Sequence, residues 1–221
     1  MSTPLADLAR PAAIIFDLDG TLVDTVETRI QAWLAVFAEE GITADRVLVA
    51  DLIGSDGRRL TREVAAAAGI TLAAGGAERI DVRSGEIYAS LNTRPEPLPG
   101  ASALLARLEA GGTPWAIATS SRREQVAASV SALLLSNEPL VIDGTHVLHA
   151  KPAPDLLLLA ARELAERPEG CWYVGDATWD MLAAAAAGMV AIGVTTGAVD
   201  AAILREAGAI AVVASLAELG I

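Results

Sequence analysis

Residues 14–25 read IIFDLDGTLVDT, an apolar run that ends abruptly in acidic residues. Asp17 and Asp19 stand two positions apart, and Gly20 follows them. Side chains two apart in an extended segment point to the same side. Both carboxylates can therefore face one crevice while Leu18 turns into the core, and Gly20 permits a sharp exit from the strand.

Five short apolar runs, this one included, are rich in β-branched or aromatic residues and are predicted strands: residues 12–16, 114–119, 171–176, 189–194 and 209–214. Segments with helical periodicity lie between them, at residues 102–110, 122–135, 155–166 and 180–187. Strands without polar alternation, separated by helices, indicate a parallel sheet covered on both faces. The predicted fold class is α/β, with a Rossmann-like, doubly wound sheet.

Residues 26–93 break this alternation, because three predicted helices (26–41, 61–69 and 77–92) follow one another without a strand. The proline-rich stretch RPEPLPG, residues 94–100, is typical of a stiff connector or hinge. We therefore predict two domains. Residues 1–22 and 97–221 form an α/β core, and residues 23–96 form an all-helical insertion.

The composition limits the possible functions. The chain has 221 residues, of which 53% are hydrophobic, so it can bury a sizeable core. Its net charge of −12 argues against nucleic-acid and anionic membrane surfaces as partners, although a bound cation could still attract a small anion. The uncharged stretch 181–199 is interrupted by glycines and predicts a buried helix and strand rather than a membrane span. A cytoplasmic protein is expected, and its oligomeric state is undetermined.

Ligands bind outside the carboxyl ends of the strands in open parallel sheets. Polar residues occupy those ends here: Asp17 and Asp19, Thr119 and Ser120, and Asp176. Asp180 follows shortly afterwards, and Lys151 stands in a loop before a predicted helix. Four crowded carboxylates are unfavourable unless a cation is bound, and oxygen ligands suit Mg²⁺. The metal and Lys151 together would make an anion site.

Four motifs occur in order, DLDGTLVD (17–24), ATSS (118–121), KPAPD (151–155) and GDATWD (175–180). In these motifs the chain resembles the haloacid dehalogenase (HAD)-like hydrolases, specifically the phosphatase branch with a helical cap inserted after the first strand. The resemblance covers nearly the whole chain. It implies a HAD-type core and identifies residues 23–96 as the cap.

The resemblance also implies roles for individual residues. Asp17 would be the nucleophile that forms an aspartyl-phosphate, and Asp19 would protonate the leaving oxygen and then accept a proton from water. Thr119, Ser120 and Lys151 would bind the phosphoryl oxygens. The Mg²⁺ ligands would be Asp17, the Asp19 backbone carbonyl and Asp176, with Asp180 beside them as a ligand or a support.

Simpler interpretations exist for several of these residues. Asp180 could merely begin a helix, and Lys151 could be a surface lysine. GSDGRRL, residues 54–60 of the predicted cap, could be a solvated loop. Alternatively, this loop closes over the site, and Arg58 or Arg59 contacts the non-reacting end of an anionic substrate.

The preferred function is a Mg²⁺-dependent phosphomonoesterase for a small phosphorylated metabolite, most similar to the phosphoglycolate phosphatase group. The alternative is a phosphomutase of the β-phosphoglucomutase type, whose cap pattern GSDGRRL matches only loosely. A 2-haloacid dehalogenase is disfavoured because those enzymes lack an acid at the position of Asp19. A non-catalytic module is disfavoured because no motif residue is missing. The sequence does not reveal the substrate.

Overall fold

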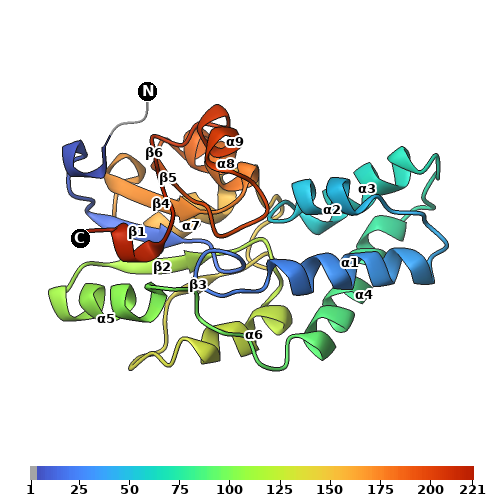
Figure 1. Cartoon of the computed structure of the whole chain (residues 1–221), viewed down its shortest axis with the longest axis horizontal. Coiled ribbons are helices and arrows are strands. Elements are labelled where there is room, and N and C mark those ends of the chain that lie inside the picture. Colours follow the sequence, from blue (N-terminus) through green and yellow to red (C-terminus); the bar gives the residue numbers. More distant parts are fainter. Residues whose placement is uncertain (1–3) are drawn as a thin grey trace.

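The computed structural model describes residues 4–221. Its centre is a six-stranded parallel sheet in the order β3-β2-β1-β4-β5-β6 (Figure 1). The strands are β1 (Ala13–Phe16), β2 (Trp115–Ala118), β3 (Val141–Ile142), β4 (Cys171–Gly175), β5 (Val190–Val194) and β6 (Ala211–Val213). The predicted α/β class and parallel sheet are confirmed.

The first strand lies at the centre of the sheet. Phe16, the last residue of β1, is in register with Ile117 of β2 on one side and with Val174 of β4 on the other. The strand order therefore reverses next to β1, which is where parallel sheets of this kind bind ligands. Strand β3 was not predicted, because its two residues are too short to form a recognisable apolar run.

Helices cover both faces of the sheet, as predicted. Helices α5 (Ala101–Gly111) and α6 (Arg123–Ala132) contribute to the hydrophobic cluster on one face. On the other face lie α7 (Asp155–Glu163), α8 (Thr178–Ala187) and α9 (Ala201–Glu206). In β1, Ile14 and Phe16 belong to the first cluster and Ile15 to the second, so an apolar strand without alternation is buried on both sides.

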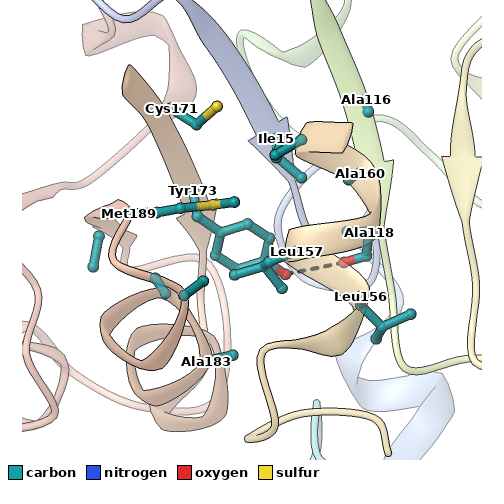
Figure 2. Close-up of a cluster of buried hydrophobic side chains, with 14 of the residues drawn as sticks. Ile15, Ala116, Ala118, Leu156, Leu157, Ala160, Cys171, Tyr173, Ala183 and Met189 are labelled. Carbon is teal, nitrogen blue, oxygen red and sulfur yellow. Dashed lines mark hydrogen bonds between the residues drawn. The ribbon is translucent and has the colours of Figure 1, made fainter. Parts of the chain in front are cut away.

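The second cluster reaches the functional edge of the sheet through one polar side chain. Figure 2 shows the Tyr173 ring among Leu157, Met189 and Ala183. Its hydroxyl donates a hydrogen bond of 3.0 Å to the backbone carbonyl of Ala118. This bond satisfies the buried hydroxyl and connects β4 to β2 across the central strand.

Four helices between β1 and α5 lie together beyond one end of the sheet (Figure 1). They are α1 (Val26–Glu39), α2 (Arg46–Leu52), α3 (Gly57–Ala67) and α4 (Gly76–Leu91), and they share a hydrophobic cluster of their own. Helix α2 was not predicted. Helix α3 begins at Gly57 rather than at residue 61, because the Asp56 side chain accepts a hydrogen bond from the Arg59 backbone N–H and caps the helix.

Two chain segments connect these helices to the sheet, and they run side by side. The Asp24 N–H donates to the Glu96 carbonyl at 2.9 Å, and the Leu98 N–H donates to the Leu22 carbonyl at 2.9 Å. The predicted boundaries after residues 22 and 96 stay predictions. Their place coincides with this paired connection, which suits a hinge.

The uncharged stretch 181–199 divides between α8 and β5, as predicted. Within residues 4–221, none of the helices combines the length and the apolar character needed to cross a membrane.

Candidate active site

One cavity lies between the core and the cap. It is lined by polar residues at the carboxyl ends of β1 and β2, by a loop lysine and by residues of the cap. Its lining includes Asp17 and Asp19 after β1, Thr119 and Ser120 after β2, and Lys151. The cap contributes Arg29, Trp33, Gly54, Ser55, Gly57, Leu60 and Asp81, among others. The tertiary structure thus brings together residues that are more than 130 positions apart in the sequence.

Lys151 lies between two aspartates, Asp17 and Asp180. We call this group of residues, at the core side of the cavity, the floor. Its Nζ lies 2.8 Å from Asp17 Oδ1 and 2.6 Å from Asp180 Oδ1, and it donates to the Tyr173 hydroxyl at 3.2 Å. The side chain is completely buried, so the interpretation of Lys151 as a surface lysine is wrong. Lys151 is also the only lysine of the chain, which otherwise uses arginine for its cations. A compact ammonium fits between two carboxylates where a planar guanidinium would not.

Asp176 lies in a cradle of small residues at the end of β4. Thr21 Oγ1 donates to its Oδ1 at 2.6 Å. A Cβ atom at Gly20 would lie 2.4 Å from Asp176 Oδ2, and one at Gly197 would lie 1.9 Å from the same oxygen. Gly20 also has a φ of +83°, a conformation that favours glycine. Glycine at these positions therefore leaves room for the carboxylate beside the chain.

One oxygen from each of Asp17, Asp176 and Asp180 lies within 4.8 Å of the other two, and all three residues are buried. Asp17 Oδ1 also accepts no well-aligned hydrogen bond from the residues that the structure describes. Burial raises the pKa of Asp17 to about 7 even though Lys151 lowers it, and burial together with Asp180 raises the pKa of Asp176. Buried, crowded oxygen ligands that resist ionisation fit a hard divalent cation such as Mg²⁺.

Asp19 has different surroundings, because the cap supplies most of its partners. Arg29 of α1 pairs with Oδ2 at 2.8 Å, and Thr25, at the start of α1, donates to Oδ1 at 2.7 Å. Tyr88 of α4 donates to Oδ1 at 3.0 Å, and Ser121 donates to Oδ2 at 2.9 Å. Burial alone would raise the pKa of Asp19, but Arg29 and the hydrogen bonds outweigh it and lower the pKa. The structure therefore stabilises the ionised carboxylate.

Thr119 and Ser120 lie where the sequence placed them, at the carboxyl end of β2. Thr119 is buried, and its Oγ1 accepts a hydrogen bond of 3.2 Å from the Ser121 N–H, which orders the turn. Ser120 Oγ donates to the Gly54 carbonyl of the cap at 3.0 Å. The two hydroxyls thus line the cavity, and one of them also connects the core to the cap.

Arg58 and Arg59 do not line this cavity. They lie in the first turn of α3, beside a neighbouring groove between the cap and the core loop 148–153, which carries Lys151. Arg58 pairs with Asp56 at 2.6 Å, and the Arg59 guanidinium lies 4.4 Å from the centre of the Trp179 ring. The loop before them does reach the site, since Gly54 lines the cavity. A substrate contact by either arginine stays a prediction.

Several site residues were not predicted: Thr21, Thr25, Arg29, Trp33, Asp81, Tyr88 and Tyr173. Arg29 carried no signal beyond an arginine on an otherwise apolar helical face, between Val26 and Ile30. Its burial, at 8% exposure, becomes visible only when the cap lies against Asp19.

The model of one family, described as haloacid dehalogenase-like hydrolase, matches residues 14–194, which contain all four motifs and every residue of the floor. The chain belongs to this family. This HAD-like hydrolase also has relatives in both sequence and structure, and their names indicate the class of reaction.

The fructose-1-phosphate phosphatase YqaB of Escherichia coli (strain K12) is 32% identical over 84% of this chain and 97% of the relative. A phosphoglycolate phosphatase of Xanthomonas campestris pv. campestris (strain 8004) is also 32% identical, over 82% of each chain. A crystal structure of a hydrolase from Pseudomonas syringae superimposes with a TM-score of 0.89 at 32% identity, over 94% of this chain and 95% of the other. This HAD-like hydrolase is a phosphatase.

Proposed function

We propose that the protein is a Mg²⁺-dependent phosphomonoesterase for a small phosphorylated metabolite and that it works through an aspartyl-phosphate on Asp17. The observation that carries the proposal is the cavity floor. There the Asp17 carboxylate lies 2.8 Å from the buried Lys151 ammonium and faces the same cavity as Thr119 and Ser120. A nucleophile, a fixed cation and hydroxyl donors are what phosphoryl transfer requires.

In the first step, a carboxylate oxygen of Asp17 attacks phosphorus while the bond from phosphorus to the leaving oxygen breaks. The leaving oxygen takes a proton from Asp19 and departs as an alcohol. In the second step, water attacks the aspartyl-phosphate, its proton passes to Asp19, and Asp17 and inorganic phosphate are released. Lys151 stays protonated throughout and offsets the charge on the phosphoryl oxygens, since Asp17 and Asp180 raise its pKa despite burial.

Asp17, Asp176 and Asp180, with the Asp19 backbone carbonyl, would hold the Mg²⁺ ion. When bound, the ion supplies positive charge to the carboxylate cluster and to the substrate phosphate. In the proposed mechanism, side chains carry out the attack on phosphorus and the proton transfers. Thr21 and the cradle of Gly20 and Gly197 keep the Asp176 carboxylate in its orientation.

Asp19 is ready for only one of its two proposed tasks in this conformation. Its carboxylate can accept a proton from water, but a proton donor must first be protonated, and Arg29 opposes that. Because Arg29, Thr25 and Tyr88 all come from the cap, a movement of the cap would release Asp19 from these contacts. The cap would thereby control the protonation state of the acid.

Such movement is also required for substrate entry. The free space in the cavity is about 50 Å³, which holds a few water molecules and no phosphorylated sugar. The paired connections at residues 22–24 and 96–98 are the only chain links between cap and core, so they can act as the hinge. Closing the cap over the substrate would exclude water and orient the phosphoryl group.

The test is phosphate release from p-nitrophenyl phosphate and from a panel of phosphorylated metabolites, with Mg²⁺ and with EDTA. We expect release with Mg²⁺, little with EDTA, and none from an Asp17→Asn variant. A phosphomutase would convert glucose 1-phosphate without releasing phosphate, and that result would replace the hydrolase proposal. Full activity after exhaustive EDTA treatment would rule out the metal.

A further inference from the structure

The end of the cavity that faces the cap contains one acidic side chain of the cap among the described lining residues. Asp81 of α4 lines the cavity together with Trp33 of α1 and Leu60 of α3. The leaving group of a phosphomonoester bound at Asp17 would extend toward these three residues. The chemistry of Asp81 therefore bears on which leaving group is accepted.

Asp81 is held in place from two sides. Arg122, which precedes α6 in the core, donates to its Oδ2 through Nε at 3.3 Å and through Nη2 at 3.1 Å. On the cap side, a Cβ atom at Gly57 would lie 1.9 Å from Oδ1, so only glycine gives the carboxylate this position. Both hydrogen bonds go to Oδ2, which leaves Oδ1 able to accept from a bound molecule.

The cations that line the cavity are engaged elsewhere. Lys151 lies between Asp17 and Asp180, and Arg29 is bound to Asp19. Arg122 is not among the lining residues, and its guanidinium is shared between Asp81 and Glu78. Arg58 pairs with Asp56 and lies 3.9 Å from Glu78, so these two guanidinium groups face three carboxylates. Burial raises the pKa of Asp81, while the adjacent Arg122 opposes the rise and favours the ionised carboxylate.

Anionic and neutral leaving groups would interact differently with the part of the cavity that Asp81, Trp33 and Leu60 line. A carboxylate or a second phosphate would meet the negative charge of Asp81 without an available cation, and repulsion between like charges is strong in a partly buried site. A hydroxyl group would donate a hydrogen bond to Oδ1 instead. The Trp33 ring and Leu60 would cover the C–H groups of a polyol, as apolar surfaces do in small-molecule sites.

We propose that Asp81 is a specificity-determining residue that selects phosphomonoesters of neutral polyols or sugars and rejects those whose leaving group is anionic. This inference rests on the proposed function and names the substrate class of the same cavity. The sequence led us to expect that a cationic residue, Arg58 or Arg59, contacts the non-reacting end of the substrate. The present proposal assigns that contact to an anionic residue instead. Phosphoglycolate and bisphosphates would then be poor substrates.

The test uses two compounds that differ mainly in the charge of the leaving group, glycerol 3-phosphate and 3-phosphoglycerate. Each is measured as a competitor of Mg²⁺-dependent p-nitrophenyl phosphate hydrolysis, because inhibition reports binding whether or not the competitor is hydrolysed. In the wild type we expect 3-phosphoglycerate to need a concentration about tenfold higher, the order of magnitude of one like-charge contact. In Asp81→Asn, which keeps the shape but removes the charge, this ratio should fall to about twofold or less.

The ratio is taken within one protein sample, so a partly unfolded variant gives the same value as a fully folded one. Glu86→Gln is the matched control, since Glu86 lies on the same helix and pairs with Arg83 at the surface, and it should leave the ratio unchanged. Equal binding of the two compounds by the wild type, preference for 3-phosphoglycerate, or an unchanged ratio in Asp81→Asn would overturn the proposal. Absence of p-nitrophenyl phosphate hydrolysis would instead overturn the phosphatase mechanism on which the proposal rests.

Discussion

At the floor of the cavity, Asp17 and Asp180 are buried and both contact the buried Lys151. Asp17 follows β1, Lys151 lies in a loop, and Asp180 lies in the first turn of α8. At the cap end, Trp33 and Asp81 come from helices that reach the cavity only because the cap lies on the core. The floor is buried and dense in charge, whereas the cap end combines apolar and acidic side chains. Under the functions proposed above, this difference would separate two tasks: the floor would carry out the reaction, and the cap end would select the substrate.

The largest effect is expected at Asp17, the proposed nucleophile. Asp17→Asn keeps the shape of the side chain but removes the attacking oxygen, so kcat/KM for every substrate should fall by about 10³-fold or more. The measurement is steady-state phosphate release, with circular dichroism as the check on folding. Near-normal turnover in the pure variant would mean that the floor does not supply the nucleophile.

Lys151 comes next, because its removal affects both catalysis and folding. Lys151→Met should lower kcat/KM by about 10²-fold and, without metal, destabilise the fold by about 3–5 kcal/mol, since one partner of a buried ion pair is lost. Lys151→Arg should also fail, because the completely buried site has no room for a planar guanidinium.

Phosphate-release assays and urea unfolding would measure the two Lys151 effects separately. Arg162→Met is the control, because Arg162 lies on α7, shortly after Lys151, with 74% of its side chain exposed. It should be nearly neutral in both assays. Equal effects of Lys151→Met and Arg162→Met would show that the buried lysine has no special role.

The carboxylate cluster predicts an unusual dependence of stability on pH. Folding raises the pKa of Asp17 from its ordinary value near 4 to about 7, so the folded state binds more protons than the unfolded state between these values. The free energy of unfolding of the metal-free protein should therefore fall, by the order of a few kcal/mol, as the pH rises from about 4 to 7. Asp19 contributes the opposite slope, but only at lower pH, because its pKa is lowered.

Thermal unfolding at pH 5, 6, 7 and 8 would test this, with EDTA and with Mg²⁺. Mg²⁺ should raise Tm more at pH 8 than at pH 5, because it binds the ionised carboxylates. Ca²⁺ should compete with Mg²⁺ without supporting turnover, since its larger shell would misplace the nucleophile. A Tm in EDTA that rises steadily from pH 5 to 8 would contradict the raised pKa of Asp17.

The smallest effect is expected outside the cavity. Arg58→Ala and Arg59→Ala should each change kcat/KM by less than about threefold, because both guanidinium groups already have surface partners in Asp56 and Glu63. The assay is phosphate release from the best metabolite of the panel. A loss of tenfold or more in either variant would show that cap movement brings an arginine onto the substrate, as the sequence first suggested.

The floor of the site could be predicted from sequence because its residues follow directly from the geometry of strands. Asp17 and Asp19 point the same way at the end of β1, and Leu18 between them is buried in the core as predicted. The carboxyl ends of parallel strands share one edge, so Thr119 and Asp176 had to lie near them. Lys151 was placed through a motif in a loop, and Asp180 through a motif that ends in the first turn of α8, close to the end of β4.

The cap side could not be predicted in the same way. A residue on a cap helix reaches the cavity only if the helix is rotated and packed against the core in the right way. The periodicity of a sequence does not predict either the rotation or the packing. Arg29 and Tyr88 contact Asp19 from two different helices, and Asp81 enters the cavity because Gly57 leaves space for it. Capping by Asp56 starts α3 earlier than predicted and places Arg58 and Arg59 beside a groove between α3 and the loop 148–153, so their contact with a substrate stays a prediction.

The sequence by itself determined the α/β fold, the family, and the group of acidic, hydroxyl and lysine side chains at the edge of the sheet, because two-residue periodicity and short loops fix those positions locally. Only the tertiary structure decided that Arg29 pairs with Asp19 and lowers its pKa, that the free space in the cavity is small, and that the Asp81 carboxylate lines it. Those features depend on contacts between the cap and the core, which lie far apart in sequence and are set by packing rather than by local pattern.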